Sequence, residues 1–358
     1  MQRTSPELAR LRFALERGLV ALPQRLVRLL LGPPLVVDGQ RLHLEAQLAL
    51  ITAALTRAPA LQTMSVAEAR AWFAEDARAA AGRKLGGVRT DELAVEGATG
   101  PLPARLYTPD RPGRSRADGD QQGLLVYFHG GGFVVCDLDT HDNPCRFLAR
   151  QADVQVLSVG YRLAPEQPFP AAIDDAVAAF RFAVERARDL GADPARVAVG
   201  GDSAGANLAT GVCRLARGDG GSAPAFQVLL YPWLDLSSKR ASYELFGNGP
   251  SLSEAEVDWF KDHYLSHADD ALDPRCSPLL AEDLAGVAPA FLATAGFDPL
   301  RDEGEEYAAR LSAAGVAVAL RRHSDLTHGF LKTISIGHAS REALLEAVGA
   351  LRLALVQR

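Results

Sequence analysis

The sequence has 358 residues, of which 48% are apolar, and its 38 basic and 44 acidic residues give a net charge of −6. This composition predicts a folded globular protein with a substantial core rather than a disordered chain. The basic residues form no long block, which argues against a nucleic-acid partner.

Four cysteines are scattered along the chain, without a CxxC pair or a Cys/His cluster at zinc-ligand spacing. They are Cys136, Cys145, Cys213 and Cys276. We therefore expect neither a metal site nor a redox motif. Free cysteines are typical of a reducing cytoplasm, which is the predicted location.

The first part of the chain, residues 6–83, is rich in Ala, Leu, Arg and Glu with helical spacing and shows no strand-like alternation. We expect helices that pack on the rest of the protein; a membrane-surface helix is the alternative, disfavoured by the acidic balance. Arginines and prolines interrupt the apolar patch 19–37 well short of the roughly 20 residues that a membrane span needs. Glu7 and Glu16 argue against a signal peptide.

Farther along, short apolar runs alternate with amphipathic stretches, which predicts a mostly parallel sheet covered by helices on both faces. Two runs that flank a Gly-Pro turn, 91–97 and 102–109, are expected to form an antiparallel hairpin at its start. The later strands are predicted at 124–129, 154–161, 197–203, 226–232, 291–298 and 316–323, and the helices at 171–190, 204–217, 303–314 and 341–355.

Two segments do not fit this alternation. The polar stretch 110–123 is expected to be an exposed loop. Residues 233–286 have an irregular Gly, Pro and Ser content with one short helical run, 254–265, and are interpreted as an insertion over one end of the sheet.

A candidate nucleophile stands at the end of the third predicted parallel strand. The sequence Gly-Asp-Ser-Ala-Gly at 201–205 is a GxSxG pattern between a strand and a helix. A sharp turn there exposes the hydroxyl of Ser203, and glycines on both sides remove side chains that would collide. A GxSxG pattern alone is weak evidence, but this context favours a catalytic serine.

A serine hydroxyl needs a base to remove its proton and a carboxylate to orient that base. In hydrolases with this turn the chain order is Ser, acid, His. His328 follows the last predicted strand and is the candidate base, while Asp298 ends the preceding strand and is the candidate acid. The other late candidates are interpreted as packing or surface histidines, first-turn helix carboxylates and a surface loop acid: His323, His338, Asp302, Glu303 and Asp325.

The intermediate of acyl transfer carries a negative oxygen, which requires hydrogen-bond donors aimed at it in advance. His-Gly-Gly-Gly-Phe at 129–133 directly follows a predicted strand, and its glycines let backbone N–H groups approach a substrate. We predict that Gly131 and Gly132 donate, together with the N–H of Ala204. A flexible turn is the alternative interpretation.

Four segments in this order resemble the hormone-sensitive-lipase-like family of carboxylesterases: HGGGF at 129–133, YRLAPE at 161–166, GDSAGAN at 201–207 and DPLRDEG at 298–304. The resemblance implies an α/β-hydrolase fold with an eight-stranded, mostly parallel sheet and the triad Ser203, Asp298 and His328. It also implies no cofactor. Residues 1–85 and the insertion 233–286 would form a helical cap on a catalytic domain of residues 86–358.

The expected activity is hydrolysis of small carboxylic esters with short to medium acyl groups. Within the motifs, His129 and Asp202 are interpreted as structural supports of the glycine loop and of the serine turn, and residues 161–166 as a brace for that loop. A lipase or an amidase would use the same residues, and a receptor that has lost the chemistry is a further alternative. A homodimer through an edge strand or the last helix is possible, and no membrane anchor is expected.

Overall fold

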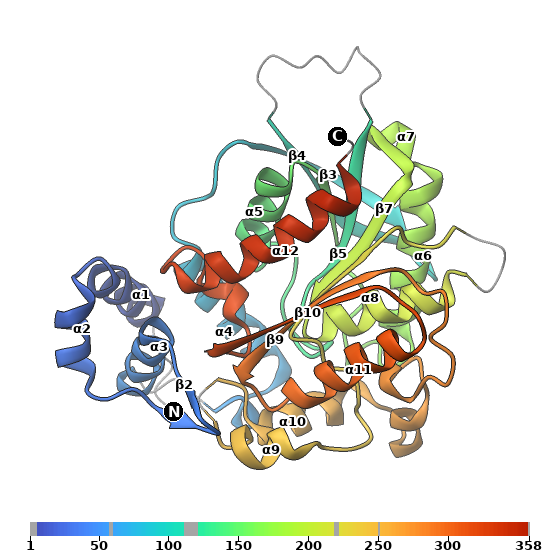
Figure 1. Ribbon diagram of the computed structural model, residues 1–358. Helices are drawn as coiled ribbons and strands as arrows, with labels where there is room; N and C mark the ends of the chain where they lie inside the picture. Colours follow the sequence, from blue (N-terminus) through green and yellow to red (C-terminus); the bar gives the residue numbers. More distant parts are fainter. Residues whose placement is uncertain (1–5, 57–59, 111–120, 218–221, 250, 357–358) are drawn as a thin grey trace.

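The computed structural model describes residues 6–56, 60–110, 121–217, 222–249 and 251–356. Its centre is an eight-stranded sheet with the strand order β10-β9-β8-β7-β5-β6-β4-β3 (Figure 1). The strands are β3 Val88–Glu96, β4 Pro101–Pro109, β5 Gln122–Phe128, β6 Gln155–Val159, β7 Ala192–Asp202, β8 Gln227–Leu230, β9 Ala290–Phe297 and β10 Val318–Thr327.

Strands β5 to β10 run parallel, whereas β3 pairs antiparallel with β4, and β4 with β6. All residues of β5, β6, β8 and β9 are buried, as expected for strands that are covered on both faces. Because the carboxyl ends of parallel strands meet at one edge of a sheet, the segments that follow β5, β7, β8, β9 and β10 converge there.

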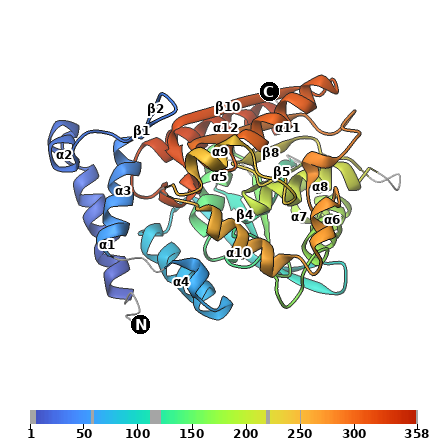
Figure 2. The ribbon, with the colours of Figure 1, turned by 90° about the horizontal axis from the view of Figure 1, so that it is seen from below.

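Helices cover both faces of this sheet (Figures 1 and 2). Helices α5 Asp142–Ala152 and α12 Ala339–Leu355 share one apolar core with the sheet. Helices α6 Ala171–Glu185, α8 Ala204–Leu215 and α11 Arg301–Ala313 share the other core. The short helix α7 Ala187–Leu190 follows α6. This architecture confirms the predicted α/β-hydrolase fold and its antiparallel hairpin, β3–β4.

Some predicted boundaries are wrong. Strand β7 begins at Ala192, before the predicted start at residue 197, and β10 continues to Thr327. Asp325 therefore lies in a strand and not in a loop. Gln122 and Gly123, predicted as loop, belong to β5, and residues 111–120 of the same predicted loop lie outside the described residues.

The N-terminal segment contains helices, as predicted, but also a small hairpin that the prediction missed. Its helices are α1 Pro6–Val20, α2 Gln24–Leu31, α3 Leu44–Leu55 and α4 Val66–Ala81, with a 3₁₀ turn at Leu61–Thr63. Strands β1 Val36–Val37 and β2 Gln40–Arg41 pair around Asp38 and Gly39, whose φ angles are 53° and 69°. An Asp-Gly pair is the preferred sequence for such a two-residue hairpin turn, so the signal was present in the sequence.

The N-terminal segment forms hydrogen bonds with the start of α12 and with β10. The carboxylate of Glu45 accepts hydrogen bonds from the backbone N–H groups of His338 and Ala339, at 3.0 and 3.1 Å, where α12 begins. The backbone N–H of His43 donates to the carbonyl of Asp325 at 2.8 Å. Anionic oxygens at a helix N-terminus are stabilising, so these contacts hold the N-terminal helices in place.

The insertion at 233–286 contains two helices, α9 Ala241–Phe246 and α10 Glu254–Tyr264, and 3₁₀ turns at Ala268–Leu272 and Pro278–Leu280. Only α10 was predicted. The side-chain amide of Asn207 on α8 donates to the carbonyls of Trp233 and Cys276, both at 2.8 Å, and so joins two distant parts of the insertion. Within the described ranges, no helix is both long enough and apolar enough to cross a membrane.

Candidate active site

The turn between β7 and α8 forces Ser203 into an unusual backbone conformation, with φ 53° and ψ −119°. Residues other than glycine rarely adopt positive φ, so the surrounding structure must impose it. The glycines on either side permit this packing. A Cβ atom on Gly205 would lie 2.0 Å from the carbonyl oxygen of Phe128, and one on Gly201 would lie 2.4 Å from the backbone of Gly205.

The structure brings Ser203, His328 and Asp298 together in a hydrogen-bonded row. The Oγ atom of Ser203 lies 3.0 Å from Nε2 of His328, and Nδ1 of His328 lies 2.8 Å from Oδ2 of Asp298. His328 follows β10, and Asp298 follows β9. The carboxylate of Asp298 is buried and also accepts a hydrogen bond from the backbone N–H of Leu300 at 2.9 Å.

The glycine loop after β5 lies beside this row. Gly131 and Gly132 have φ angles of 114° and 59° and line the same cavity as Ser203. Ala204 begins α8 and does not itself line the cavity. In the part of the chain that the structure describes, the backbone N–H groups of Gly131, Gly132 and Ala204 have no hydrogen-bond acceptor. They are therefore available to a substrate oxygen.

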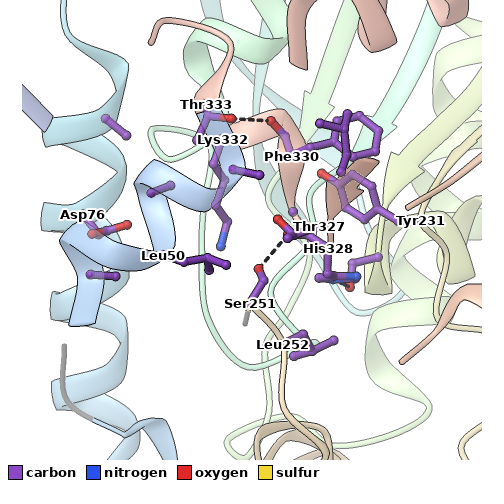
Figure 3. Close-up of a pocket in the computed structure, with 18 of the residues that line it drawn as sticks. Leu50, Asp76, Tyr231, Ser251, Leu252, Thr327, His328, Phe330, Lys332 and Thr333 are labelled. Carbon is purple, nitrogen blue, oxygen red and sulfur yellow. Dashed lines mark hydrogen bonds between the residues drawn. The ribbon is translucent and has the colours of Figure 1, made fainter. Parts of the chain in front are cut away.

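The site opens into a cavity of about 520 Å³. Figure 3 shows His328, Tyr231 and Leu252 on one side, and Leu50 and Asp76 of the N-terminal helices on the other. Apolar side chains from the two segments outside the core fold supply much of the wall: Phe13, Leu48, Phe73, Leu252, Val257 and Phe260. A concave space with apolar walls and convergent polar groups is typical of a small-molecule site.

Comparisons with known proteins show the family of this chain. A profile of the alpha/beta hydrolase fold matches residues 125–332. A carboxylic ester hydrolase of Mycobacterium tuberculosis, LipN, is 47% identical over 328 residues, which cover 90% of this chain and 85% of that protein. The chain belongs to the hormone-sensitive-lipase-like family of α/β-hydrolases.

Two further relatives extend this finding. An ethyl acetate hydrolase of Pseudomonas putida is 41% identical over 294 residues, which cover 82% of this chain and 91% of that protein. An ester hydrolase from the metagenome of Lake Arreo, solved with a derivative of bipyridine phosphonate, is 40% identical. The structural match to it has a TM-score of 0.82 and covers 87% of this chain and 98% of that one.

Asp202 connects the serine turn to the glycine loop. Its Oδ1 atom accepts hydrogen bonds from the hydroxyl of Tyr127 at 2.8 Å and the N–H of Gly130 at 3.0 Å, and lies 3.2 Å from Nε2 of His141. Burial alone would raise the pKa of Asp202, but these neighbours, His141 first, lower it to about 2. The side chain is therefore ionised and joins the turn and the loop.

Side chains from outside the motif also contact the backbone of the glycine loop and of the residues next to it. The hydroxyl of Tyr161 donates to the carbonyl of His129 at 2.7 Å, and the two rings stack with centroids 4.4 Å apart. Burial, and secondly the neighbouring His141, lowers the pKa of His129 to about 4, so its ring is neutral at pH 7. Arg70 on α4, which the sequence did not single out, donates to the carbonyls of Val134 and Ala164, both at 2.9 Å.

Two further residues near the site were missed or misread. Ser251, in the insertion, donates a hydrogen bond from its hydroxyl to the carbonyl of His328 at 2.8 Å (Figure 3), and nothing in the sequence signals this contact.

Glu303 lies in the first turn of α11, as predicted, but it is completely buried. Its Oε1 atom accepts from the N–H of Leu234, which follows β8 in the chain. Helix-dipole stabilisation alone does not explain such burial.

In the described part of the chain, the other histidines and acids near its end do not contact Ser203. His323 on β10 packs its ring against Phe330, with centroids 5.6 Å apart, and His338 precedes α12. The carboxylate of Asp302 accepts a hydrogen bond from the backbone N–H of Ser242 at 2.8 Å and is not part of the row formed by Ser203, His328 and Asp298. Among the described residues, no group of three or more His, Cys, Asp or Glu side chains is arranged to hold a metal ion.

The burial of Glu303 predicts that the free energy of unfolding depends on pH. Burial first, and then the neighbouring Asp235 and Asp298, raise its pKa well above the ordinary value, so the folded protein keeps a proton that the unfolded chain releases above about pH 4.3. Stability must then fall as pH rises through that window. Glu303→Gln, which stays neutral, should gain stability relative to wild type as pH increases from about 5 to about 8.

Chemical denaturation at several pH values measures this difference, which can change by up to about 1.4 kcal/mol per pH unit. Glu282→Gln, at an exposed glutamate, is the matched control for the loss of one carboxylate. A Glu303→Gln difference that does not vary with pH would contradict a neutral buried carboxyl group.

Proposed function

We propose that this carboxylic ester hydrolase cleaves esters with short to medium acyl groups through an acyl-enzyme on Ser203, with His328 as the base and Asp298 as the residue that orients it. The observation that carries the proposal is the hydrogen-bonded row of these three side chains at the wall of a cavity. The serine mechanism is general for this fold.

In the first half of the reaction, neutral His328 donates its Nδ1–H to Asp298 and accepts the hydroxyl proton of Ser203 at Nε2. The Oγ atom forms a bond to the ester carbonyl carbon, and the carbonyl oxygen becomes negative. The N–H groups of Gly131, Gly132 and Ala204 are the proposed donors to that oxygen. His328 then passes its proton to the alkoxy oxygen, and the alcohol leaves.

In the second half, a water molecule takes the place of the alcohol. His328 accepts a proton from the water, whose oxygen attacks the acyl carbon and forms a second tetrahedral intermediate. Collapse of this intermediate breaks the bond to Ser203, which regains its proton from His328. The carboxylic acid is released and the enzyme returns to its starting state.

The acyl-chain range is inferred from the walls of the site. A cavity of about 520 Å³ is a common size for small-molecule sites. Phe260 closes the space at the glycine loop, because a Cβ atom on Gly132 would lie 2.2 Å from its ring. The relative named for ethyl acetate hydrolysis acts on a short ester, which supports the same range here.

We further propose that residues 1–85 and 233–286 act as the cap of the catalytic domain 86–358. Both segments contribute cavity-lining side chains, such as Phe13 and Phe73 from the first and Leu252 and Phe260 from the second. Substrate selectivity would then depend on contacts made by the cap, while the chemistry depends on residues at the edge of the sheet.

Two other expectations stay predictions. A homodimer is supported by the position of β10 at the edge of the sheet, where Leu320 is exposed. A cytoplasmic location is supported by the cysteines, because all four are free and buried.

The proposed function is tested by the hydrolysis of p-nitrophenyl esters of increasing acyl length. The wild-type rate should be highest for short or medium chains, because Phe260 closes the space at the glycine loop. Ser203→Ala should lower kcat by at least roughly 10⁴-fold on every ester while the thermal unfolding midpoint stays near that of wild type. A folded Ser203→Ala enzyme that retains most of its turnover would exclude the proposed nucleophile.

The glycine loop gives a second prediction. In Gly131→Ala the new Cβ atom would lie 2.2 Å from the carbonyl oxygen of Val135, at a φ of 114°, so the loop must move. Loss of one oxyanion donor should lower kcat by roughly 10²- to 10³-fold, which corresponds to about 3 kcal/mol of transition-state stabilisation. The matched control is Gly349→Ala in α12, where a Cβ atom meets nothing within 4 Å.

Thermal unfolding of both variants separates a loop shift from general destabilisation. Near-normal kcat in folded Gly131→Ala would show that this loop does not supply the donors.

A further inference from the structure

The outer faces of α1 and α2 expose an unusual number of leucines. On α2, Leu29 is 82% exposed and Leu30 is 66% exposed, and Leu26 is exposed with them. Val27 is the one buried residue of this helix. Figures 1 and 2 both place α1 and α2 at one end of the molecule, beyond the helices that cover the sheet.

The exposed leucines follow helical spacing. Leu26, Leu29 and Leu30 stand at positions i, i+3 and i+4 of α2 and so share one side of the helix, and on α1 Leu11 and Leu15 stand four residues apart. Two stripes of this kind on neighbouring helices exceed the scattered apolar residues of an ordinary surface, and they indicate a binding surface.

Basic residues accompany these leucines. Arg25 and Arg28 are exposed on α2, and neither forms an ion pair with a carboxylate in the described part of the chain. The described residues 6–55 contain six basic and four acidic residues, although the whole chain has a net charge of −6. Of the basic residues, Arg10 and Arg12 are paired with carboxylates of the same end of the molecule. The unpaired positive charge beside the exposed leucines is therefore that of Arg25 and Arg28.

A helix with an exposed leucine stripe, Arg25 at the border of that stripe and Arg28 on its polar side matches a surface of anionic lipids, in which leucines enter the acyl boundary and arginines remain among the phosphates. A second copy of the chain fits less well, because a twofold contact through this face would bring the arginines of both copies together. We propose that the outer face of α1 and α2, defined by Leu11, Leu15, Leu26, Leu29 and Leu30 with Arg25 and Arg28, docks on anionic membrane surfaces.

The same helix α1 faces the catalytic cavity with its other side, because Phe13, Glu16 and Val20 line that cavity. A docked enzyme therefore has one wall of its cavity formed by a helix that lies on the lipid.

Flotation with lipid vesicles tests the docking separately from the chemistry, because it can be run on Ser203→Ala, which is expected to bind without turnover. One set of vesicles is phosphatidylcholine, and the other is an equimolar mixture with anionic phosphatidylglycerol. The Ser203→Ala protein should float with the anionic vesicles and much less with the neutral ones, and added salt should weaken the binding.

Two surface variants and one control locate the contact. Leu26→Ser with Leu29→Ser should lower the partition coefficient at least roughly tenfold, because two leucines no longer leave water. Arg25→Gln with Arg28→Gln should lower binding to anionic vesicles by roughly fivefold per arginine. Leu272→Ser, at an exposed leucine in a distant 3₁₀ turn, should bind like the parent.

None of these positions lines the cavity, so hydrolysis of dissolved p-nitrophenyl acetate by the same substitutions in the wild-type background should stay unchanged. The proposal is overturned if the parent does not float with anionic vesicles, or if the leucine pair has no effect on flotation. A dimer in light scattering that the leucine pair converts to monomer, without vesicle binding, would assign the face to a second copy instead. Failure of ester hydrolysis alone would overturn the proposed function and leave the docking intact.

Discussion

The positive φ angle of Ser203 is the constraint on which the rest of the site depends. With φ at 53°, the hydroxyl projects from the carboxyl end of β7 into the cavity while the backbone turns directly into α8. This turn is possible only because glycines at 201 and 205 let it pack against the carbonyls of Phe128 and His129. The serine turn and the start of the glycine loop are therefore one packed unit, and their relative position is set before any substrate binds.

Buried polar groups stabilise this unit against its strain. Asp202 has its carboxylate oxygens satisfied by Tyr127, Gly130 and Tyr231, with His141 beside them. Charge-assisted hydrogen bonds of this kind are stronger than neutral ones, and removal of one partner leaves a costly unpaired charge. The network therefore holds the glycine loop, which carries the proposed oxyanion donors, against the serine turn, although Asp202 itself is not part of the hydrogen-bonded row of Ser203, His328 and Asp298.

The sequence predicts those parts of the protein that local rules determine. Buried strands read as apolar runs, and glycines at 131, 132, 201 and 205 mark places where a Cβ atom cannot fit. Ser203, Asp298 and His328 could be identified because each stands at or just after the end of a predicted strand, in the order Ser, acid, His that such hydrolases share. Contacts between distant segments carry no such signal. Ser251 contacts His328, and Arg70 contacts Val134, only because the insertion and the N-terminal segment pack against the sheet domain. The burial of Glu303 was likewise hidden, because an acidic residue in the first turn of a helix normally lies in water.

The central claim, that Ser203 is the nucleophile activated by His328, is tested most directly by covalent labelling with a fluorophosphonate ester and peptide mapping by mass spectrometry. The account predicts a single adduct per chain on the peptide that contains Ser203, formed much more slowly in His328→Ala. An adduct on another residue, or no adduct in a preparation that hydrolyses p-nitrophenyl acetate, would contradict it.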